Sequence, residues 1–170
     1  MFIFRYQFGM LCFLMLALST TGGQADMKAG HEAYAENDYV RAFDEWLKEA
    51  KTGNPIAQNN IGYMYRKARG VPISWEEAAY WYKRAAEQGM PEAMTNLGKM
   101  LDEGEGVKQD FVESYKWFLL ASRRGLEAAE GHLKILRDEF MSAEAVAEAI
   151  KRADNWSPKT ETNASSGNAE

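Results

Sequence analysis

The stretch from Asn54 to Gly89 reads NPIAQNNIGYMYRKARGVPISWEEAAYWYKRAAEQG, and most of its structural residues have a counterpart 36 positions along the chain. The matched residues, 36 positions apart, are of the same type, whether glycine, alanine, aliphatic or aromatic. The clearest sets are Gly53, Gly89 and Gly125; Ala57, Ala93 and Ala129; Ile61, Leu97 and Leu133; and Trp46, Tyr82 and Phe118. A fixed period of this length is typical of a solenoid, in which one supersecondary unit is repeated and stacked on its neighbours.

Each unit of the repeat is predicted to be a pair of antiparallel helices. In the segment 39–52 the apolar residues recur at helical spacing, which places them on one stripe of a helix. Gly53 is expected in the left-handed conformation just past the end of that helix, and Pro55 suits the first turn of the next one. The same combination of a glycine after one helix and a proline in the first turn of the next recurs at Gly89 and Pro91. The sequence therefore predicts an all-α fold, a right-handed α-solenoid of four antiparallel helix pairs.

Two glycines lie inside the predicted first helices of the central units, Gly62 and Gly98. A glycine inside a helix costs about 1 kcal/mol relative to alanine, so its recurrence calls for a packing reason. The second helices supply large aromatic residues at matching places, Tyr82 and Phe118. We predict that the second helix of each unit approaches the first closely at the glycine, with the aromatic ring against it.

The turns inside the two central units are four residues longer than the turn of the first pair, and they contain Ala-Arg-Gly-Val and Gly-Glu-Gly-Val. With these turns, and with the run Ala85 to Gly89 that follows Trp81 and Tyr82, the chain resembles the Sel-one-like repeat (SLR) family, a longer-looped relative of the tetratricopeptide repeat (TPR). The resemblance covers about residues 55–129. It implies a TPR-like α/α superhelix that serves as a scaffold for protein complexes, with the first helix of each pair on the concave side.

Boundaries along the chain follow from the repeat and from changes in composition. Residues 1–25 are expected to be a cleavable signal peptide and 26–54 an N-terminal TPR-like helix pair. Residues 55–90 and 91–126 are the two Sel-one-like repeats, and 127–156 are a partial repeat with a capping helix. The segment 157–170 is rich in small polar residues and is expected to be disordered.

The N-terminal leader has the three parts of an export signal. Arg5 provides a positive charge, and Met10 to Leu18 is an uncharged apolar run that is too short to span a bilayer comfortably. Small residues then predict cleavage before Asp26, although a retained anchor or a buried N-terminal helix is the alternative. Cys12 is the only cysteine, so the processed chain would contain no thiol. We expect an exported chain, located in a bacterial periplasm or secreted.

The charge balance bears on the partners of the chain. The formal net charge is −5 and there is no long basic run. Such a chain is not expected to bind nucleic acid, nor to bind a membrane after the signal peptide is removed.

No set of converging catalytic groups is visible in the sequence. His31 and His132 are the only histidines, and neither has a second ligand at metal-binding spacing. The acidic cluster of Asp102, Glu103 and Glu105 is read as a solvated helix end. We therefore expect a non-enzymatic protein with no metal and no cofactor.

The resemblance to TPR domains, taken position by position, implies a binding groove on the concave side. The residues it selects are His31, Tyr34, Asn59, Tyr63, Arg66, Lys67, Thr95, Lys99 and Asp102. Their amide and cationic groups suit the carbonyls and carboxylates of an extended peptide. We expect a monomeric adaptor that binds another protein. The alternatives are an envelope enzyme or regulator of peptidoglycan metabolism, and a glycan-binding module that presents exposed tryptophans.

Overall fold

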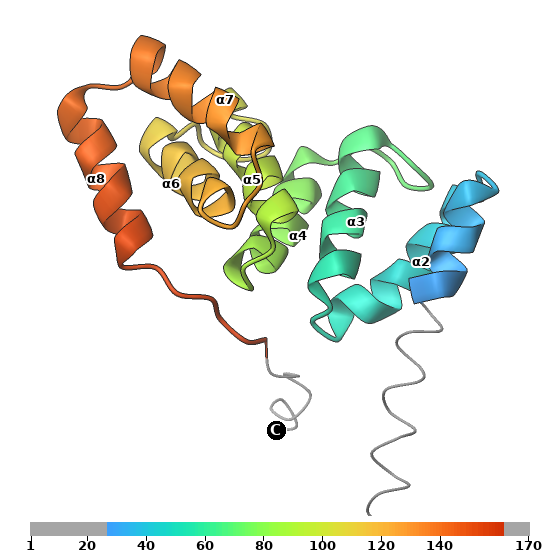
Figure 1. The fold of residues 1–170 in the computed structure, drawn as a ribbon. Coiled ribbons are helices and arrows are strands. Elements are labelled where there is room, and N and C mark those ends of the chain that lie inside the picture. Colours follow the sequence, from blue (N-terminus) through green and yellow to red (C-terminus); the bar gives the residue numbers. More distant parts are fainter. Residues whose placement is uncertain (1–26, 162–170) are drawn as a thin grey trace, which may run out of the picture.

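The structure is a computed structural model that describes residues 27–161 (Figure 1). The predicted signal peptide and the end of the predicted disordered tail lie outside the described residues. Within them, a helix covering residues 27–35 is followed by α2 (Tyr39–Lys51), α3 (Pro55–Lys67), α4 (Trp75–Glu87), α5 (Pro91–Glu103) and α6 (Phe111–Ser122). The chain ends in α7 (Ala128–Ile135), a π-helical turn η1 (Leu136–Phe140) and α8 (Ala143–Asp154).

The helices stack as consecutive pairs (Figure 1). Helices α3 and α4 form one pair and α5 and α6 the next, while α2 packs on α3, α4 on α5 and α6 on α7. The described residues form no strand. The predicted all-α solenoid of antiparallel helix pairs is therefore confirmed.

The glycines inside the first helices lie against aromatic rings of the second helices, as the sequence predicts. A Cβ added to Gly62 would lie 2.8 Å from Cδ1 of Tyr82, and one added to Gly98 would lie 3.0 Å from Cε1 of Phe118. Both rings are almost completely buried. Because no side chain fits at these places, glycine allows the two helices of a unit to interlock without a void.

The helices have side-chain caps at their N-terminal ends and glycines at their C-terminal ends, the latter as predicted. The side chains of Ser74 and Asp110 accept hydrogen bonds from the backbone N–H groups of Glu77 and Glu113, respectively. The C′ glycines have left-handed φ angles, +99° at Gly53, +96° at Gly89 and +86° at Gly125. These caps satisfy backbone groups that the helices leave open.

The long turns of the two central units are wedged against the preceding unit. A Cβ on Gly70 would lie 2.4 Å from the carbonyl oxygen of Tyr39, and one on Gly106 would lie 2.2 Å from the carbonyl carbon of Trp75. Tyr39 and Trp75 begin helices α2 and α4. Each long turn thus docks on the first turn of the second helix of the unit before it, which only a glycine permits.

Helix α8, the last of the described helices, packs on α6. Ala149 and Ala153 are buried there, and the ring of Trp156 meets the ring of Trp117 edge-on with centroids 5.8 Å apart. The packing of α8 on α6 therefore buries small apolar side chains of α8.

Residues 157–161 differ from the expected disordered tail. They run in extended conformation back along the solenoid from α8 (Figure 1). The N–H of Lys159 donates to the carbonyl of Glu87 at 2.8 Å, and the carboxylate of Glu161 pairs with Arg84. Composition predicts disorder because the segment lacks apolar residues, but these charge-assisted contacts hold it in place.

Among residues 27–161, no helix combines the length and the apolar composition needed to cross a bilayer.

Candidate functional site

The residues selected for the groove lie on helices of one class. We call the surface formed by the helix over residues 27–35 and by α3, α5 and α7 the first-helix face. Asn59, Tyr63, Arg66 and Lys67 lie on α3, whereas Thr95, Lys99 and Asp102 lie on α5. His31 and Tyr34 lie on the helix over residues 27–35, which precedes α2. The nine residues are therefore distributed over three successive first helices.

Several of these residues are engaged within the protein. The Nδ2 of Asn96 donates to Oδ1 of Asn59 at 3.0 Å, which joins α5 to α3. Thr95 is 6% exposed, and its hydroxyl donates to the carbonyl of Pro91. Because their polar groups already have partners, Asn59 and Thr95 contribute to joining the repeats and present little to a ligand.

Arg66 is also held within the protein. Its guanidinium lies 3.3 Å from the carboxylate of Glu103 and 3.2 Å from that of Glu105, and it sits over the ring of Trp75 at 6.0 Å. Burial, and then the nearby charge of Glu105, raises the pKa of Glu103. The acidic cluster, read from the sequence as solvated, is therefore partly an ion-pair network that links α3 to the turn after α5.

An aromatic group marks the N-terminal side of the first-helix face. Tyr34 stacks on Trp46 with ring centroids 5.5 Å apart and meets Tyr39 edge-on at 5.1 Å. Burial, together with a hydrogen bond to Tyr63, raises the pKa of the Tyr34 hydroxyl. Tyr63 itself is 38% exposed. Tyr34 and Tyr63 therefore adjoin one another, with the Tyr63 ring open to a ligand.

The contacts of His31 lie within the N-terminal helix pair. Its ring lies edge-on to Trp46 at 5.2 Å, and its Nδ1 is 2.6 Å from the carbonyl of Met27. The side chain remains exposed at the N-terminal edge of the face.

The cationic groups that remain available are Lys67 and Lys99. Lys67 is exposed and Lys99 half-buried, and neither has an ion-pair partner within the described part of the chain. Both amines can reach a carboxylate on a bound peptide.

A histidine and a carboxylate that are distant in the sequence come together beside Lys99. The ring of His132 stacks on Phe118 with centroids 4.5 Å apart. Burial and the charge of Lys99 lower the pKa of His132, and the charge of Asp102 opposes them. Burial in turn raises the pKa of Asp102. Local spacing in the sequence could not show that these two charges act on one another, because the residues lie on α5 and α7.

Sequence reasoning also missed a groove on the opposite side, between α4 and α6. It has a volume of about 510 Å³, and residues of α5 such as Leu97 and Leu101 line it together with Trp117. Tyr80 and Lys83 border it from α4, and Trp156 and Lys159 border it from the C-terminal segment. Tyr80 is 53% exposed although its neighbours on both sides are buried, and an aromatic residue at this place in the sequence does not by itself reveal a groove.

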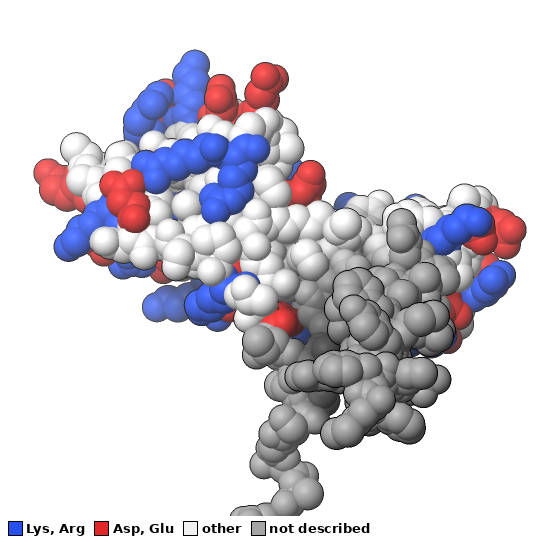
Figure 2. All heavy atoms as spheres, turned by 60° about the horizontal axis from the view of Figure 1, so that its bottom comes forward, with Lys and Arg blue, Asp and Glu red and all other residues white. Residues whose placement is uncertain are grey.

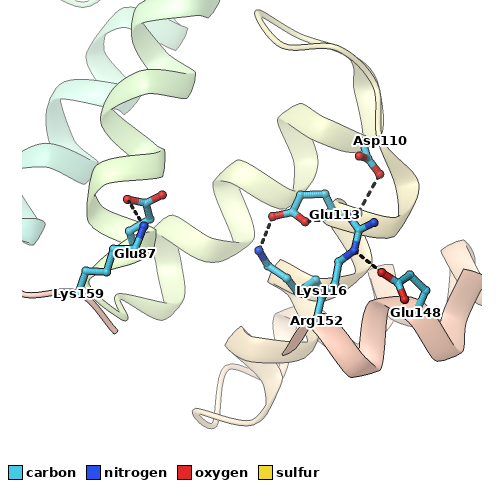
Figure 3. Close-up of polar contacts among 7 residues, drawn as sticks. All are labelled: Glu87, Asp110, Glu113, Lys116, Glu148, Arg152 and Lys159. Atoms are coloured by element: carbon cyan, nitrogen blue, oxygen red, sulfur yellow. Dashed lines mark hydrogen bonds and ion pairs between the residues drawn. The ribbon is translucent and has the colours of Figure 1, made fainter. Parts of the chain in front are cut away.

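Ion pairs within the protein occupy much of the rim of this groove (Figure 3). On one side Lys159 lies 3.5 Å from Glu87, and on the other Lys116 pairs with Glu113, which Arg152 also contacts at 3.5 Å. Glu113 therefore bridges α6 and α8. These charges fix the walls of the groove rather than leaving them open to a ligand.

Charge is not segregated on the face that Figure 2 turns toward the viewer, where basic and acidic side chains lie around largely uncharged surface. The described residues contain no group of three or more histidine, cysteine, aspartate or glutamate side chains placed to hold a metal ion.

Comparison with known proteins identifies the repeats. The Sel1 repeat family matches residues 55–90 and 91–126, in agreement with the two repeats predicted from the sequence. No match was found among curated proteins.

Several solved structures share the fold, among them the following two. A protective antigen present in uropathogenic Escherichia coli strains, which displays an SLR fold, aligns with 25% identity and a TM-score of 0.72 over 80% of this chain. A Sel1 repeat protein from Oxalobacter formigenes aligns with 34% identity and a TM-score of 0.62 over 76% of this chain. The chain spans 30% of the length of the first protein and 55% of the length of the second.

Proteins built from such repeats are generally non-catalytic scaffolds that mediate protein–protein interaction. The resemblance drawn from the residues of the 54–89 stretch is thus confirmed by both kinds of comparison. The chain contains two consecutive Sel1 repeats, at residues 55–90 and 91–126.

Proposed function

We propose that this chain is an exported, non-catalytic adaptor that binds an extended segment of another protein on its first-helix face. The observation that carries the proposal is the grouping of Tyr63, Lys67 and Lys99 on that face. Tyr63 is 38% exposed, and the two lysines have no ion-pair partner among the described residues. An exposed aromatic ring flanked by available cations suits a peptide that carries apolar and acidic side chains.

The location that we propose is the bacterial envelope. Its support is the leader in the sequence, with Arg5 ahead of a short apolar run and small residues before Asp26. Both similar structures come from bacterial proteins, and one of these is a protective antigen. Processing before Asp26 would leave a monomeric periplasmic or secreted adaptor.

A glycan-binding module is the weaker alternative, because it needs exposed tryptophans. Trp81 and Trp117 are 6% and 3% exposed, and the ring of Trp75 lies under Arg66. An envelope enzyme acting on peptidoglycan would need a polar residue whose loss abolishes turnover. His132 and Asp102, whose charges act on one another, are the residues where we would make that change first.

The adaptor proposal is tested with the double substitution Lys67→Glu and Lys99→Glu. We expect these changes to abolish capture of the partner from an envelope extract, while circular dichroism and the melting temperature stay unchanged. The matched control is Lys51→Glu with Lys108→Glu, which makes the same change in net charge at two exposed lysines away from the face. Equal capture by both double variants would contradict the proposal.

A further inference from the structure

The end of the described chain is held by the side chains of Gln58, Arg84 and Gln88, which we call the polar cradle. Glu161 is 24% exposed, and Oε1 of its carboxylate accepts from Nε of Arg84 at 2.9 Å, while a second guanidinium nitrogen of Arg84 contacts Oε2. Nε2 of Gln58 donates to the same Oε2 at 2.9 Å. The carboxylate therefore accepts from two side chains that lie on two different helices, α3 and α4.

The cradle is built into the protein rather than formed by free surface groups. Gln58 is fully buried, and its Nε2 also donates to the carbonyl of Ala50 at 3.1 Å, while its Oε1 accepts from Nε2 of Gln88 at 2.8 Å. The guanidinium of Arg84 lies over the rings of Trp81 and Tyr80 at 5.0 and 5.7 Å. The carbonyl of Ala50 and the carboxylate of Glu161 both accept from Nε2 of Gln58, so the amide donor of this buried side chain is satisfied by the segment.

The repeat itself does not require this cradle. In the second Sel1 repeat the positions that correspond to Gln58 and Arg84 hold Met94 and Leu120, which are 0% and 3% exposed. An apolar pair thus suffices for packing at the same place in the fold. The polar pair in the first repeat consequently has a purpose other than stacking the helices.

The segment that fills the cradle has few other attachments. Residues 157–160 are exposed and extended, and the N–H of Lys159 donates to the carbonyl of Glu87 at 2.8 Å. Pro158 lies beside Gly89. The contacts resemble those of an extended peptide on a receptor, namely one backbone hydrogen bond, the ion pair of Lys159 with Glu87 at 3.5 Å, and a carboxylate two residues later.

We propose that the cradle of Arg84, Gln58 and Gln88 is a recognition site for a glutamate on an extended peptide, and that residues 156–161 occupy it as a ligand held in cis. This site lies along the ends of α3 and α4 and does not depend on the binding function proposed for the first-helix face. A peptide in trans reaches the cradle only by displacing Glu161, so the C-terminal segment regulates access to it.

The test uses the full chain labelled with nitrogen-15 and the peptide acetyl-WSPKTE-amide, which reproduces residues 156–161. Nuclear magnetic resonance follows the Nε signal of Arg84 and the side-chain amides of Gln58 and Gln88. In the variant Glu161→Ala we expect saturable shifts of these signals. The wild-type chain should need at least about tenfold more peptide, because the tethered segment competes at millimolar effective concentration.

Two controls make the outcome specific. The peptide acetyl-WSPKTQ-amide lacks the carboxylate and should leave the signals in place. The variant Glu161→Ala with Arg84→Leu, which copies the residue of the second repeat, should show no saturable shift of the Gln58 and Gln88 side-chain amides while it keeps its melting temperature. Equal shifts with both peptides, or no saturable shift in Glu161→Ala, would overturn the proposal and leave the segment as a structural clasp.

Discussion

Gly62 and Tyr82 lie so close that a methyl group on the glycine would be 2.8 Å from the aromatic Cδ1. Tyr82 is 1% exposed and cannot move away without disturbing the core. The contact joins the two helices of the first Sel1 repeat, and its counterpart between Gly98 and Phe118 joins those of the second. The interlock of glycine and ring is therefore the packing unit from which the solenoid is repeated.

Gly62→Ala is expected to destabilise the protein by about 1–3 kcal/mol, the usual cost of overpacking a core, despite the better helix propensity of alanine. Gly131→Ala is the matched control, because Gly131 lies in α7 and a Cβ there would meet nothing within 4 Å. That change should be neutral or stabilising. Urea unfolding of both variants measures the difference. Equal midpoints would show that the ring of Tyr82 leaves room for a methyl group at position 62.

The two repeats also differ at one backbone position in a way that gives a second prediction. Ala68 and Gly104 both end a first helix in the left-handed conformation, with φ of 51° and 72°. A residue with a Cβ costs roughly 1–2 kcal/mol there. Gly104→Ala should therefore destabilise by about 1 kcal/mol, and Ala68→Gly should stabilise by a similar or smaller amount, since glycine also raises the entropy of the unfolded chain. Thermal melting of the two single variants checks the opposite signs.

The stability of the protein should depend on pH through His132. Burial and Lys99 hold its pKa below the usual value, so the folded protein binds a proton there less readily than the unfolded chain. The contribution of the neutral ring is present above the unfolded pKa of about 6.5 and is lost as the pH falls through the lower folded pKa. His132→Gln should flatten the unfolding free energy between about pH 7 and pH 5. A profile unchanged by this substitution would mean that His132 titrates normally.

Arg66 and Glu105 should be energetically coupled, because the guanidinium lies 3.2 Å from the carboxylate and the arginine side chain is 19% exposed. In a double-mutant cycle with Arg66→Gln and Glu105→Gln we expect a coupling of about 0.5–1 kcal/mol. The pair Lys28 and Glu32, with side chains 78% and 57% exposed, is the control and should give a smaller value. Additive effects of the two substitutions would mean that the ion pair of Arg66 and Glu105 does not help to join the two repeats.

Much of the fold could be predicted from the sequence because its determinants are local and repeated. Gly53 and Gly89 end helices in the left-handed conformation, Ser74 caps α4, and Gly62 admits the ring of Tyr82. Each of these features depends on a residue type at a fixed place in a 36-residue period. The repeat therefore supplies the same evidence more than once.

The candidate binding surfaces were less predictable because they depend on pairings between distant residues. Arg66 was expected to be a free cation, yet Glu103 and Glu105 lie against it, nearly 40 positions later. Glu161 contacts Gln58 across 103 positions, and composition alone predicted a disordered tail. Which polar group pairs with which depends on how the repeats stack, and no periodicity in the sequence encodes that.

The measurement that tests the central claim most directly is photo-crosslinking at the first-helix face in the native cell. A photoreactive phenylalanine derivative replaces Tyr63, which is 38% exposed, or in the control Tyr80, which is 53% exposed on the groove between α4 and α6. An adaptor that binds through its first-helix face should give a discrete crosslinked adduct at Tyr63 and none at Tyr80. An adduct at Tyr80 alone, or at both positions equally, would contradict the assignment of the binding face.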